Sequence, residues 1–479
     1  MAITRIIYWL GCAVILIAVM MAATCLVALL MADLKMVAVM GVTAIGLSVL
    51  GSLFVLTTSK TPSRETNSDA LIFLLLFWGL IPIGAAIPYW LTFPELGFLR
   101  GYFTAVSAIT TTGANGYVVE TLPSTLVYWQ SFLQFFGGVC VATFAVVVLA
   151  ALNLTGTGVH RSALFTLKKG ELFTRLIGIG RVVAGVYALI AFVCFILMAL
   201  GGAPVFEALC LSLSGISTGG MTPRSEDLSL YIPRFSTLVL VLACGFGAMN
   251  VSVIWDVLRL RSWVNIKRLV TNIEHRTLIA MGVGLTLFGL FYAGLQNLFP
   301  LFVEAVFFVS TAGFVYDPIS LEQIPSVVLI SIALVGGSAL STAGGLKIIR
   351  IILLFKQLAT DISRSSHPSR VLPVQFKHRR VPDRAFLSIW LYFFGYTLVF
   401  GAGIVWLGAA GLNFTDSTTI SVASLANIGP LLPSTLPDTG LTWPDLTQMQ
   451  MLVSSALMLI GRVEVLAVLV LMTPSFWRQ

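Results

Sequence analysis

The sequence predicts an all-α polytopic membrane protein, with two N-terminal helices followed by four pseudo-symmetric helix/pore-loop/helix repeats around one central pore. Of its 479 residues, 58% are hydrophobic and only 10% are charged, whereas soluble domains carry roughly 25% charged residues. Long apolar runs alternate with four short segments that each end in a Gly-containing loop. Only helices and closed barrels satisfy their backbone inside a bilayer.

Ten apolar runs are close to, or longer than, the roughly 20 residues that a helix needs to cross the hydrocarbon core. They are too long for barrel strands, which need about 9–11 residues. The first two helices, within residues 1–58, precede the repeats. The expected spans are residues 6–32, 36–56, 70–92, 124–152, 177–200, 233–258, 277–298, 325–356, 385–409 and 446–473.

After the first two helices, a pattern of span, short apolar stretch, Gly loop and span recurs four times. The short stretches cannot cross the membrane, so we expect them to be half-membrane pore helices. They cover residues 102–109, 205–216, 301–309 and 418–425. The repeats that contain them are expected over residues 70–152, 177–260, 277–356 and 385–479.

The loops after the expected pore helices are the candidate cation site. Non-helical backbone at membrane depth is tolerated where protein surrounds it or water fills the space, and its carbonyls can replace a cation's hydration shell. Close helix packing through Gly and Thr would explain any one loop, but four equivalent copies favour a filter. Its expected residues are Thr111, Thr112, Gly113, Ser217, Thr218, Gly219, Thr311, Ala312, Gly313, Asn427, Ile428 and Gly429.

Lys and Arg gather in alternate loops, for example at Arg161, Lys168 and Lys169, and again between Arg364 and Arg384. The opposite loops carry mainly Asp and Glu. The positive-inside rule therefore predicts that both termini lie in the cytoplasm. The net charge of +8 does not require nucleic acid as a partner, because anionic lipid headgroups account for basic residues beside helix ends.

Enzyme chemistry finds no support in the sequence. The six Cys lie in apolar runs without a Cys-x-x-Cys pair, and there is no phosphate-binding Gly-x-x-x-x-Gly-Lys-Ser/Thr loop. We therefore expect no organic cofactor. The His side chains are expected in exposed or interfacial loops, at His160, His275, His367 and His378.

The four loops resemble those of the Trk/Ktr/HKT superfamily of potassium transporters, and the ten-helix layout is most similar to the TrkH branch. Residues 336–347, with two Gly-Gly pairs, resemble the family's intramembrane gating loop. Gly costs about 1 kcal/mol relative to Ala within a helix, which also favours a break here. Residues 461–478 resemble the family's closing segment. The resemblance implies a gate formed by Gly336, Gly337, Gly344, Gly345, Lys347 and Arg462.

The resemblance further implies potassium uptake across the bacterial inner membrane, with K⁺ as the permeant ion and Rb⁺ as its analogue. Ser in place of Gly113 accompanies sodium selectivity in plant relatives, so Gly113 favours K⁺ here. Family members form homodimers with one pore per protomer. They also bind a cytosolic ring of nucleotide-binding regulatory subunits of the RCK type, and both partners are expected here.

Three alternatives stay open at this point. The chain could be a secondary transporter coupled to Na⁺ or H⁺, with Asp256, Glu304 or Asp416 binding the coupling ion, although such folds usually show paired repeats. The small residues of 336–347 could serve a tight helix crossing. Arg462 could pair within the bundle only to hold helices together.

Two departures from the family pattern are visible. The second to fourth repeats place an acidic residue near the start of the pore helix, whereas the first has Arg100-Gly101-Tyr102. The first filter loop is therefore expected to be braced differently. The segments 245–250 and 272–276 are more similar to the Ktr branch than to the TrkH branch.

Overall fold

The computed structural model describes residues 3–59, 67–151, 172–260, 263–318, 321, 324–366, 374–376, 379–380, 383–435 and 440–463. These residues are almost all helical, as the sequence predicts. In the part described, the two short strands β1 (Gln375–Phe376) and β2 (Arg379–Arg380) pair antiparallel. Among the predicted features, the basic residues Arg161, Lys168 and Lys169 and the chain after Val463 lie outside the described residues, as do His160, His367 and His378.

Six helices of the described chain are long and apolar enough to cross a membrane, or seven if a bent pair is counted as one span. They agree with the predicted fold class. A further helix of 28 residues, α5 (Ser124–Ala151), follows the first of the four short helices described below, which enter the molecule without crossing it and are called re-entrant helices here. The six are α1 (Ile3–Leu30), α2 (Leu34–Thr58), α3 (Asn67–Thr92), α6 (Leu172–Leu200), α12 (Ile273–Ala293) and α17 (Asp383–Ala409).

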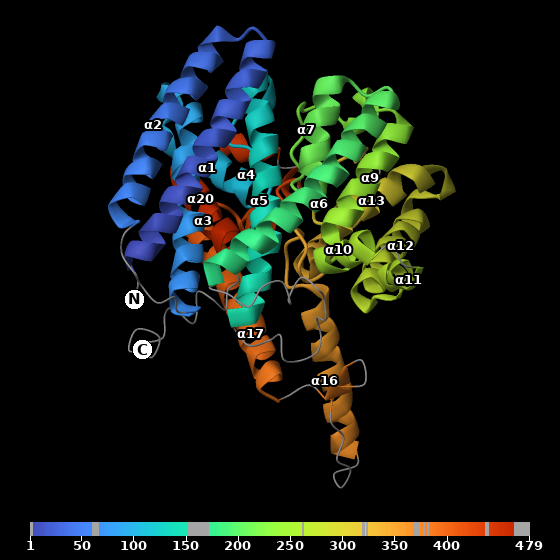
Figure 1. The fold of residues 1–479 in the computed structure, drawn as a ribbon. Coiled ribbons are helices and arrows are strands. Elements are labelled where there is room, and N and C mark those ends of the chain that lie inside the picture. Colours follow the sequence, from blue (N-terminus) through green and yellow to red (C-terminus); the bar gives the residue numbers. More distant parts are fainter. Residues whose placement is uncertain are drawn as a thin grey trace.

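The first two helices form an antiparallel hairpin on one flank of the molecule (Figure 1). Asp33 caps α2 by accepting the amide of Met36 at 3.1 Å, which satisfies one of the free N–H groups of that helix end. The helices cross closely where Gly11 faces Gly51, because a Cβ added to Gly51 would lie 2.9 Å from the carbonyl oxygen of Gly11. Small residues at such crossings let membrane helices approach.

Four helices of 12 residues each do not cross the membrane: α4 (Phe98–Ile109), α7 (Val205–Ile216), α13 (Leu298–Val309) and α18 (Phe414–Leu425). Twelve residues of helix span about 18 Å, well short of the hydrocarbon core. All four end at the predicted residue. Three begin three or four residues earlier than predicted, because their first turns contain polar residues, Gly or Pro that interrupt the apolar pattern.

Two of the ten predicted spans are broken. The predicted continuous helix over residues 233–258 is wrong: α9 (Arg234–Ala248) and α10 (Val251–Leu260) meet at 103°. The break in the eighth span agrees with the expectation, because α15 (Ser326–Val335) and α16 (Ile348–Ser366) flank the non-helical residues 336–347. Helix α16 then extends beyond the other helices (Figure 1).

The remaining elements are short or connect the repeats. The last described helix, α20 (Gln448–Val463), lies in the centre of the bundle against α4 and α18. The connecting elements are η1 (Pro94–Leu96), η2 (Val119–Thr121), α8 (Leu228–Tyr231), α11 (Trp263–Thr271), η5 (Leu295–Asn297), α19 (Leu431–Thr435) and η7 (Trp443–Asp445).

Candidate cation pathway

All four re-entrant helices end in the same backbone conformation. Two residues after the helix, the chain enters the left-handed region at Thr111 (φ 53°), Thr218 (φ 51°), Thr311 (φ 60°) and Asn427 (φ 53°). The amide of each of these residues donates to the carbonyl three residues earlier. Positive φ is uncommon for residues other than Gly, so its recurrence at equivalent positions marks four copies of one structural unit.

This shared conformation identifies the residues that correspond between loops. Gly113 (φ 85°) and Gly313 (φ 69°) each stand two residues after the left-handed Thr. In the second loop that position is Gly220 (φ 70°), two residues after Thr218. The prediction of Gly219 at this filter position is off by one residue, because the second loop has two adjacent Gly residues and the prediction takes the first of them.

The first three loops lie against one another in chain order. A Cβ atom added to Gly113 would collide with the carbonyl oxygen of Gly219, and one added to Gly220 would collide with that of Ala312. Gln134 of α5 donates its side-chain amide to the Gly219 carbonyl at 2.9 Å, which fixes that peptide unit. Only Gly fits this close approach of backbone to backbone.

The fourth loop closes the ring. A Cβ added to Gly313 would lie 2.8 Å from Cγ1 of Ile428, which joins the third loop to the fourth. The amide of Gly429 donates to the carbonyl of Thr112 at 2.6 Å, and Asn427 donates its side-chain amide to the Thr112 hydroxyl at 2.9 Å, which joins the fourth loop to the first. The four loops, called here the filter loops after their expected role, therefore meet around one point, as the sequence predicts.

The non-helical residues 336–347, called here the intramembrane loop, close on themselves. The helix before them ends at Gly336 (φ 71°), whose backbone packs against Gly345 (φ 73°) so closely that a Cβ on Gly345 would lie 2.7 Å from the Cα of Gly336. A Cβ on Gly337 would collide with that of Ala343. Lys347 donates its ammonium group to the carbonyl of Ala343 and, at 3.3 Å, to that of Ser341.

The intramembrane loop contacts the second, third and fourth filter loops. Thr218 donates its hydroxyl to the Thr342 hydroxyl at 3.0 Å, and the amide of Gly344 donates to the hydroxyl of Thr311 at 2.8 Å. A Cβ on Gly344 would collide with the carbonyl oxygen of Ala426. The expected gate glycines thus bring this loop against the ring.

Arg462 of α20 supplies the contact with the first loop. Its guanidinium donates to the carbonyl of Thr110 at 2.5 Å, to the hydroxyl of Thr111 and to the carbonyl of Thr342 at 2.6 Å. The residue is only 8% exposed. A single buried cation therefore bridges the first filter loop and the intramembrane loop, and both expected gate elements lie in one place.

Each of the four helices makes a different polar contact, and those of the first three reach the loop that follows the helix. In the first repeat, Arg100 donates to the carbonyls of Gly116 at 2.7 Å and Pro444 at 2.8 Å, which confirms the expected different bracing. In the third, Glu304 accepts the amides of Tyr316 at 2.6 Å and Asp317 at 2.9 Å. In the fourth, the Asp416 carboxylate accepts from the side chain of Asn413 at 2.9 Å.

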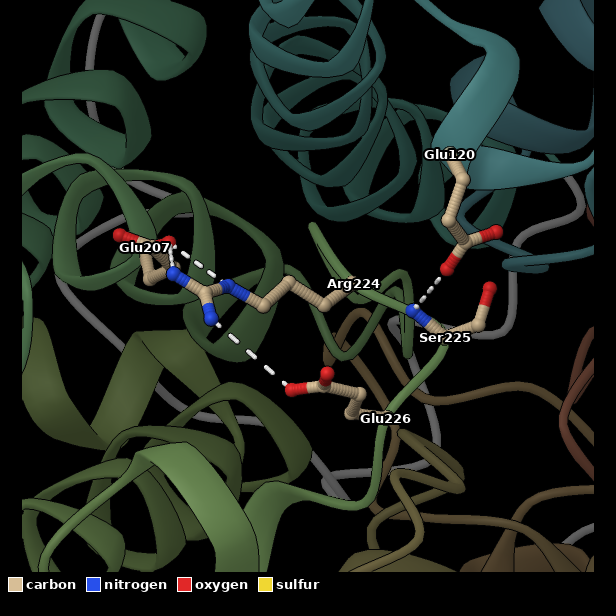
Figure 2. A network of polar contacts seen from close by, with 5 residues as sticks. All are labelled: Glu120, Glu207, Arg224, Ser225 and Glu226. Atoms are coloured by element: carbon tan, nitrogen blue, oxygen red, sulfur yellow. Dashed lines mark hydrogen bonds and ion pairs between the residues drawn. The ribbon is translucent and has the colours of Figure 1, made fainter.

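The second loop is held by an ion pair (Figure 2). Arg224 donates to one carboxylate oxygen of Glu207 at 2.9 and 2.5 Å, and Glu226 lies 3.9 Å from the same guanidinium. Glu120 of the first repeat accepts the amide of Ser225 at 3.0 Å. Hydrogen bonding from Ser225 lowers the pKa of Glu120. The first two repeats are thus joined outside the ring.

A cavity of about 500 Å³ opens on the side of the ring away from the intramembrane loop. Gly113 and Gly220 of the ring line it together with Glu226 and Asp227. Carboxylates at the mouth of a narrow site raise the local cation concentration. Glu226 and Asp227 therefore place negative charge at this cavity, where Glu226 also lies 3.9 Å from the guanidinium of Arg224.

The other predicted candidates are dispersed. Asp256, Glu304 and Asp416 lie on α10, α13 and α18, and no group of three or more His, Cys, Asp or Glu suited to a metal ion occurs among the described residues. The expectation for His275 is wrong, because it is fully buried in the first turn of α12. Its position three residues after the N-cap Asn272 is the signal that identifies a helical residue.

Comparison with known proteins agrees with this geometry. Residues 35–479 match TrkH, described as a cation transport protein. The chain belongs to the TrkH family of cation transport proteins. It is 31% identical over 435 residues, 88% of each chain, to the Trk system potassium uptake protein TrkG of Escherichia coli strain K12. It is 29% identical over 446 residues, 90% of each chain, to TrkH of Salmonella typhimurium.

The fold of this TrkH family member also matches a solved structure. The crystal structure of the potassium transporter TrkH from Vibrio parahaemolyticus superposes with a TM-score of 0.88 at 26% identity, covering 100% of both chains. These relatives are transport proteins, in agreement with the expectation that the chain is not an enzyme. Together with the apolar helices, the family identifies an integral membrane protein.

Proposed function

We propose that this chain takes up K⁺ across the bacterial inner membrane through the ring of four filter loops. The closed ring of Gly113, Gly220, Gly313 and Gly429 is the observation that carries the proposal. The curated relatives of this chain are named as potassium uptake proteins, which supports K⁺ as the permeant ion and Rb⁺ as its analogue.

The proposed filter binds K⁺ through backbone carbonyls, which replace the hydration shell of the ion. Four helices of 12 residues aim their C-terminal ends at the ring, and each end carries about half a negative charge. These partial charges favour a cation at the ring. The site comprises the twelve residues expected from the sequence together with Gly220, which takes the ring position assigned to Gly219.

The intramembrane loop and Arg462 form the proposed gate. The loop contacts all four filter loops, three directly and the first through Arg462. A cation that leaves the filter meets a fixed positive charge at Arg462. Displacement of the loop and of Arg462 would therefore be needed for flux.

The remaining expectations complete the proposal. Both termini face the cytoplasm, in keeping with the positive-inside rule, and K⁺ enters through the cavity next to Glu226 and Asp227. The protein forms a homodimer with one pore per protomer. A cytosolic RCK-type nucleotide-binding subunit regulates the gate, and the chain itself binds no organic cofactor.

Ion flux into liposomes that contain the purified chain tests the proposal. Rb⁺ and Na⁺ uptake are measured with a gradient of each ion in turn, with and without Na⁺ or H⁺ on the opposite side. Uptake of Rb⁺ driven by its own gradient supports a pore. Uptake that requires a second ion gradient supports a coupled transporter instead, and Na⁺ uptake as fast as Rb⁺ uptake contradicts the filter assignment.

A further inference from the structure

The break between α9 and α10 leaves backbone groups that a continuous helix would pair internally. The carbonyls of Gly247 and Ala248 are at the end of α9, where helices have unsatisfied acceptors. Each accepts an amide of the intramembrane loop: Thr342 donates to Gly247 at 3.2 Å, and Ser338 donates to Ala248 at 3.1 Å. The break is thus a docking point for this loop.

The far side of the break adds a third bond. The amide of Val251, at the start of α10, donates to the carbonyl of Leu340 at 3.1 Å. The Thr342 hydroxyl also donates to the Gly247 carbonyl at 3.0 Å. An unpaired buried backbone group costs about as much as a lost hydrogen bond. The broken helix and the loop therefore satisfy each other's backbone, which explains why a long apolar run is not a single helix.

Two residues in the first turn of α12 support this contact. The carboxylate of Glu274 accepts the amide of Ala339, in the intramembrane loop, at 2.7 Å. The ring of His275 accepts the amide of Asn250, in the break, through Nε2 at 3.1 Å, and its Nδ1 lies 2.8 Å from the carbonyl of Leu269. All three of these polar side chains, Glu274, His275 and Asn250, are at most 3% exposed.

We infer that Glu274 and His275 are positioning residues that hold the intramembrane loop closed, Glu274 directly and His275 through the helix break. The inference rests on the proposed function, in which this loop limits flux. A neutral His275 with the proton on Nδ1 donates to Leu269 and accepts from Asn250 at the same time. One ring thereby ties α11 to the break.

Helix α11 connects Glu274 and His275, called here the latch, to the surface. Lys267, Arg268 and Val270 of α11 are exposed, whereas Leu269 between them bonds to the buried His275. Only Asn272 separates α11 from α12. The hydrogen bond between Leu269 and His275 therefore joins α11 to the residues that hold the loop.

The carboxylate of Glu274 could hold the loop through its hydrogen bond to Ala339, which depends on the length of the side chain. Alternatively, it could act only through its negative charge, which is favourable in itself near a helix N-terminus. The variants Glu274→Asp and Glu274→Gln separate these roles. Asp keeps the charge but is one methylene shorter, so it cannot bond Ala339 without a backbone shift. Gln keeps the length and an acceptor oxygen but loses the charge. Glu95→Asp, at an exposed Glu in the first turn of η1, is the matched control.

Rb⁺ flux is measured in liposomes for each full-length variant after size-exclusion chromatography. We expect Glu274→Asp to raise flux by roughly three- to tenfold, as expected when one hydrogen bond no longer favours the closed state. We expect Glu274→Gln and Glu95→Asp to stay near the unmodified rate. For His275, we expect His275→Leu to raise flux and His275→Gln, which retains an acceptor for Asn250, to raise it less.

Arg462→Ala, measured alongside, separates failure of the latch from failure of the gate. If Arg462→Ala raises flux and neither Glu274→Asp nor His275→Leu does, the latch is wrong and the gate stands. If Glu274→Gln raises flux and Glu274→Asp does not, charge at the helix terminus acts and the inference is overturned. If none of these variants changes flux, the proposed gate itself fails.

Discussion

At the scale of single residues, Arg462 stands out because it is a buried cation that bonds to neutral oxygen atoms. A charged Arg near the bilayer centre costs about 2.5–3.5 kcal/mol on insertion scales. The carbonyls of Thr110 and Thr342 and the hydroxyl of Thr111 offset this cost. All three acceptors belong to the ring or to the intramembrane loop, so the position of Arg462 depends on both.

We expect Arg462→Ala to raise K⁺ flux, because it removes both a positive charge from the proposed pathway and the bridge between the first filter loop and Thr342. Rb⁺ uptake into liposomes measures the effect. Arg462→Lys, which keeps the charge but cannot make the same three contacts, is expected to give a smaller rise. Loss of folded protein in Arg462→Ala, with Arg462→Lys folded and unchanged in flux, would instead assign Arg462 a purely structural role.

The ring glycines give a second prediction at this scale. Gly113→Ser and Gly220→Ser should each weaken the preference for K⁺ over Na⁺, because both residues have positive φ and a Cβ at either would collide with the neighbouring loop. Gly411 also has positive φ (98°) but nothing within 4 Å of its Cβ position, so Gly411→Ser is the control for backbone strain alone. The ratio of Rb⁺ to Na⁺ flux decides, and equal ratios in all three variants would contradict the ring.

At the scale of elements, the four re-entrant helices share their length and their C-terminal geometry but differ in their polar contacts. Arg100 in the first repeat and Glu304 in the third bond to backbone groups of the returning loop. The second uses the Glu207–Arg224 ion pair. The four helices therefore share one C-terminal geometry but not one set of polar contacts.

Loss of the Glu207–Arg224 ion pair should loosen the second filter loop. We expect Arg224→Gln to lower the Rb⁺ to Na⁺ flux ratio, and the exchanged pair Glu207→Arg with Arg224→Glu to recover part of it. Arg364→Gln is the control, since Arg364 pairs with Asp361 on the surface of α16 at 3.3 Å, and exposed pairs contribute only about 0–1 kcal/mol. A normal ratio in Arg224→Gln would show that the pair does not position the loop.

The re-entrant helices could be predicted from the sequence because short apolar stretches before a Gly loop are too short to span. The break after α9 could not be predicted from hydropathy, since Phe246, Met249 and Val251 keep the run apolar across it. Its partner, the intramembrane loop, lies about 90 residues further along the chain, and no local pattern reveals such a pairing. The one available signal is the polar Asn250 close to Gly245 and Gly247.

The alignment of the four filter loops with one another was also only partly predicted from the sequence. The residue type at each loop, Thr or Gly, was enough to find the four sites but not to align them. Counting four residues from the correctly predicted helix ends gives Gly113, Gly220, Gly313 and Gly429, whereas matching the first Gly of each loop gives Gly219 in the second. His275 could not be placed because its two partners, Asn250 and Leu269, belong to other elements.

At the scale of the whole molecule, the hairpin of α1 and α2 lies at the flank of the helices that carry the four ring loops (Figure 1). The hairpin packs mainly on α3 and α5, and in the described chain none of the ring contacts given above involves it. Its packing is therefore expected to affect stability without affecting the choice of ion.

The Gly11–Gly51 crossing tests this separation. Gly51→Val should lower the melting temperature, because its Cβ would lie 2.7 Å from Ile15 and 2.9 Å from the carbonyl of Gly11, and overpacking costs about 1–3 kcal/mol. Gly46→Val, on the same helix with nothing within 4 Å, should leave it unchanged. A thermal scan in detergent measures both, and a changed Rb⁺ to Na⁺ ratio in folded Gly51→Val would contradict the separation.

The four ring positions are encoded separately in one gene. In a channel assembled from four identical subunits, one filter mutation is present in four copies, so it changes all four sides of the filter at once. Here the four ring positions are separate in the sequence, so one mutation changes only one of them. They are Gly113, Gly220, Gly313 and Gly429. In the proposed filter, selection can therefore adjust the ion preference one ring position at a time. The different polar contacts of the four helices are what such stepwise change would leave behind.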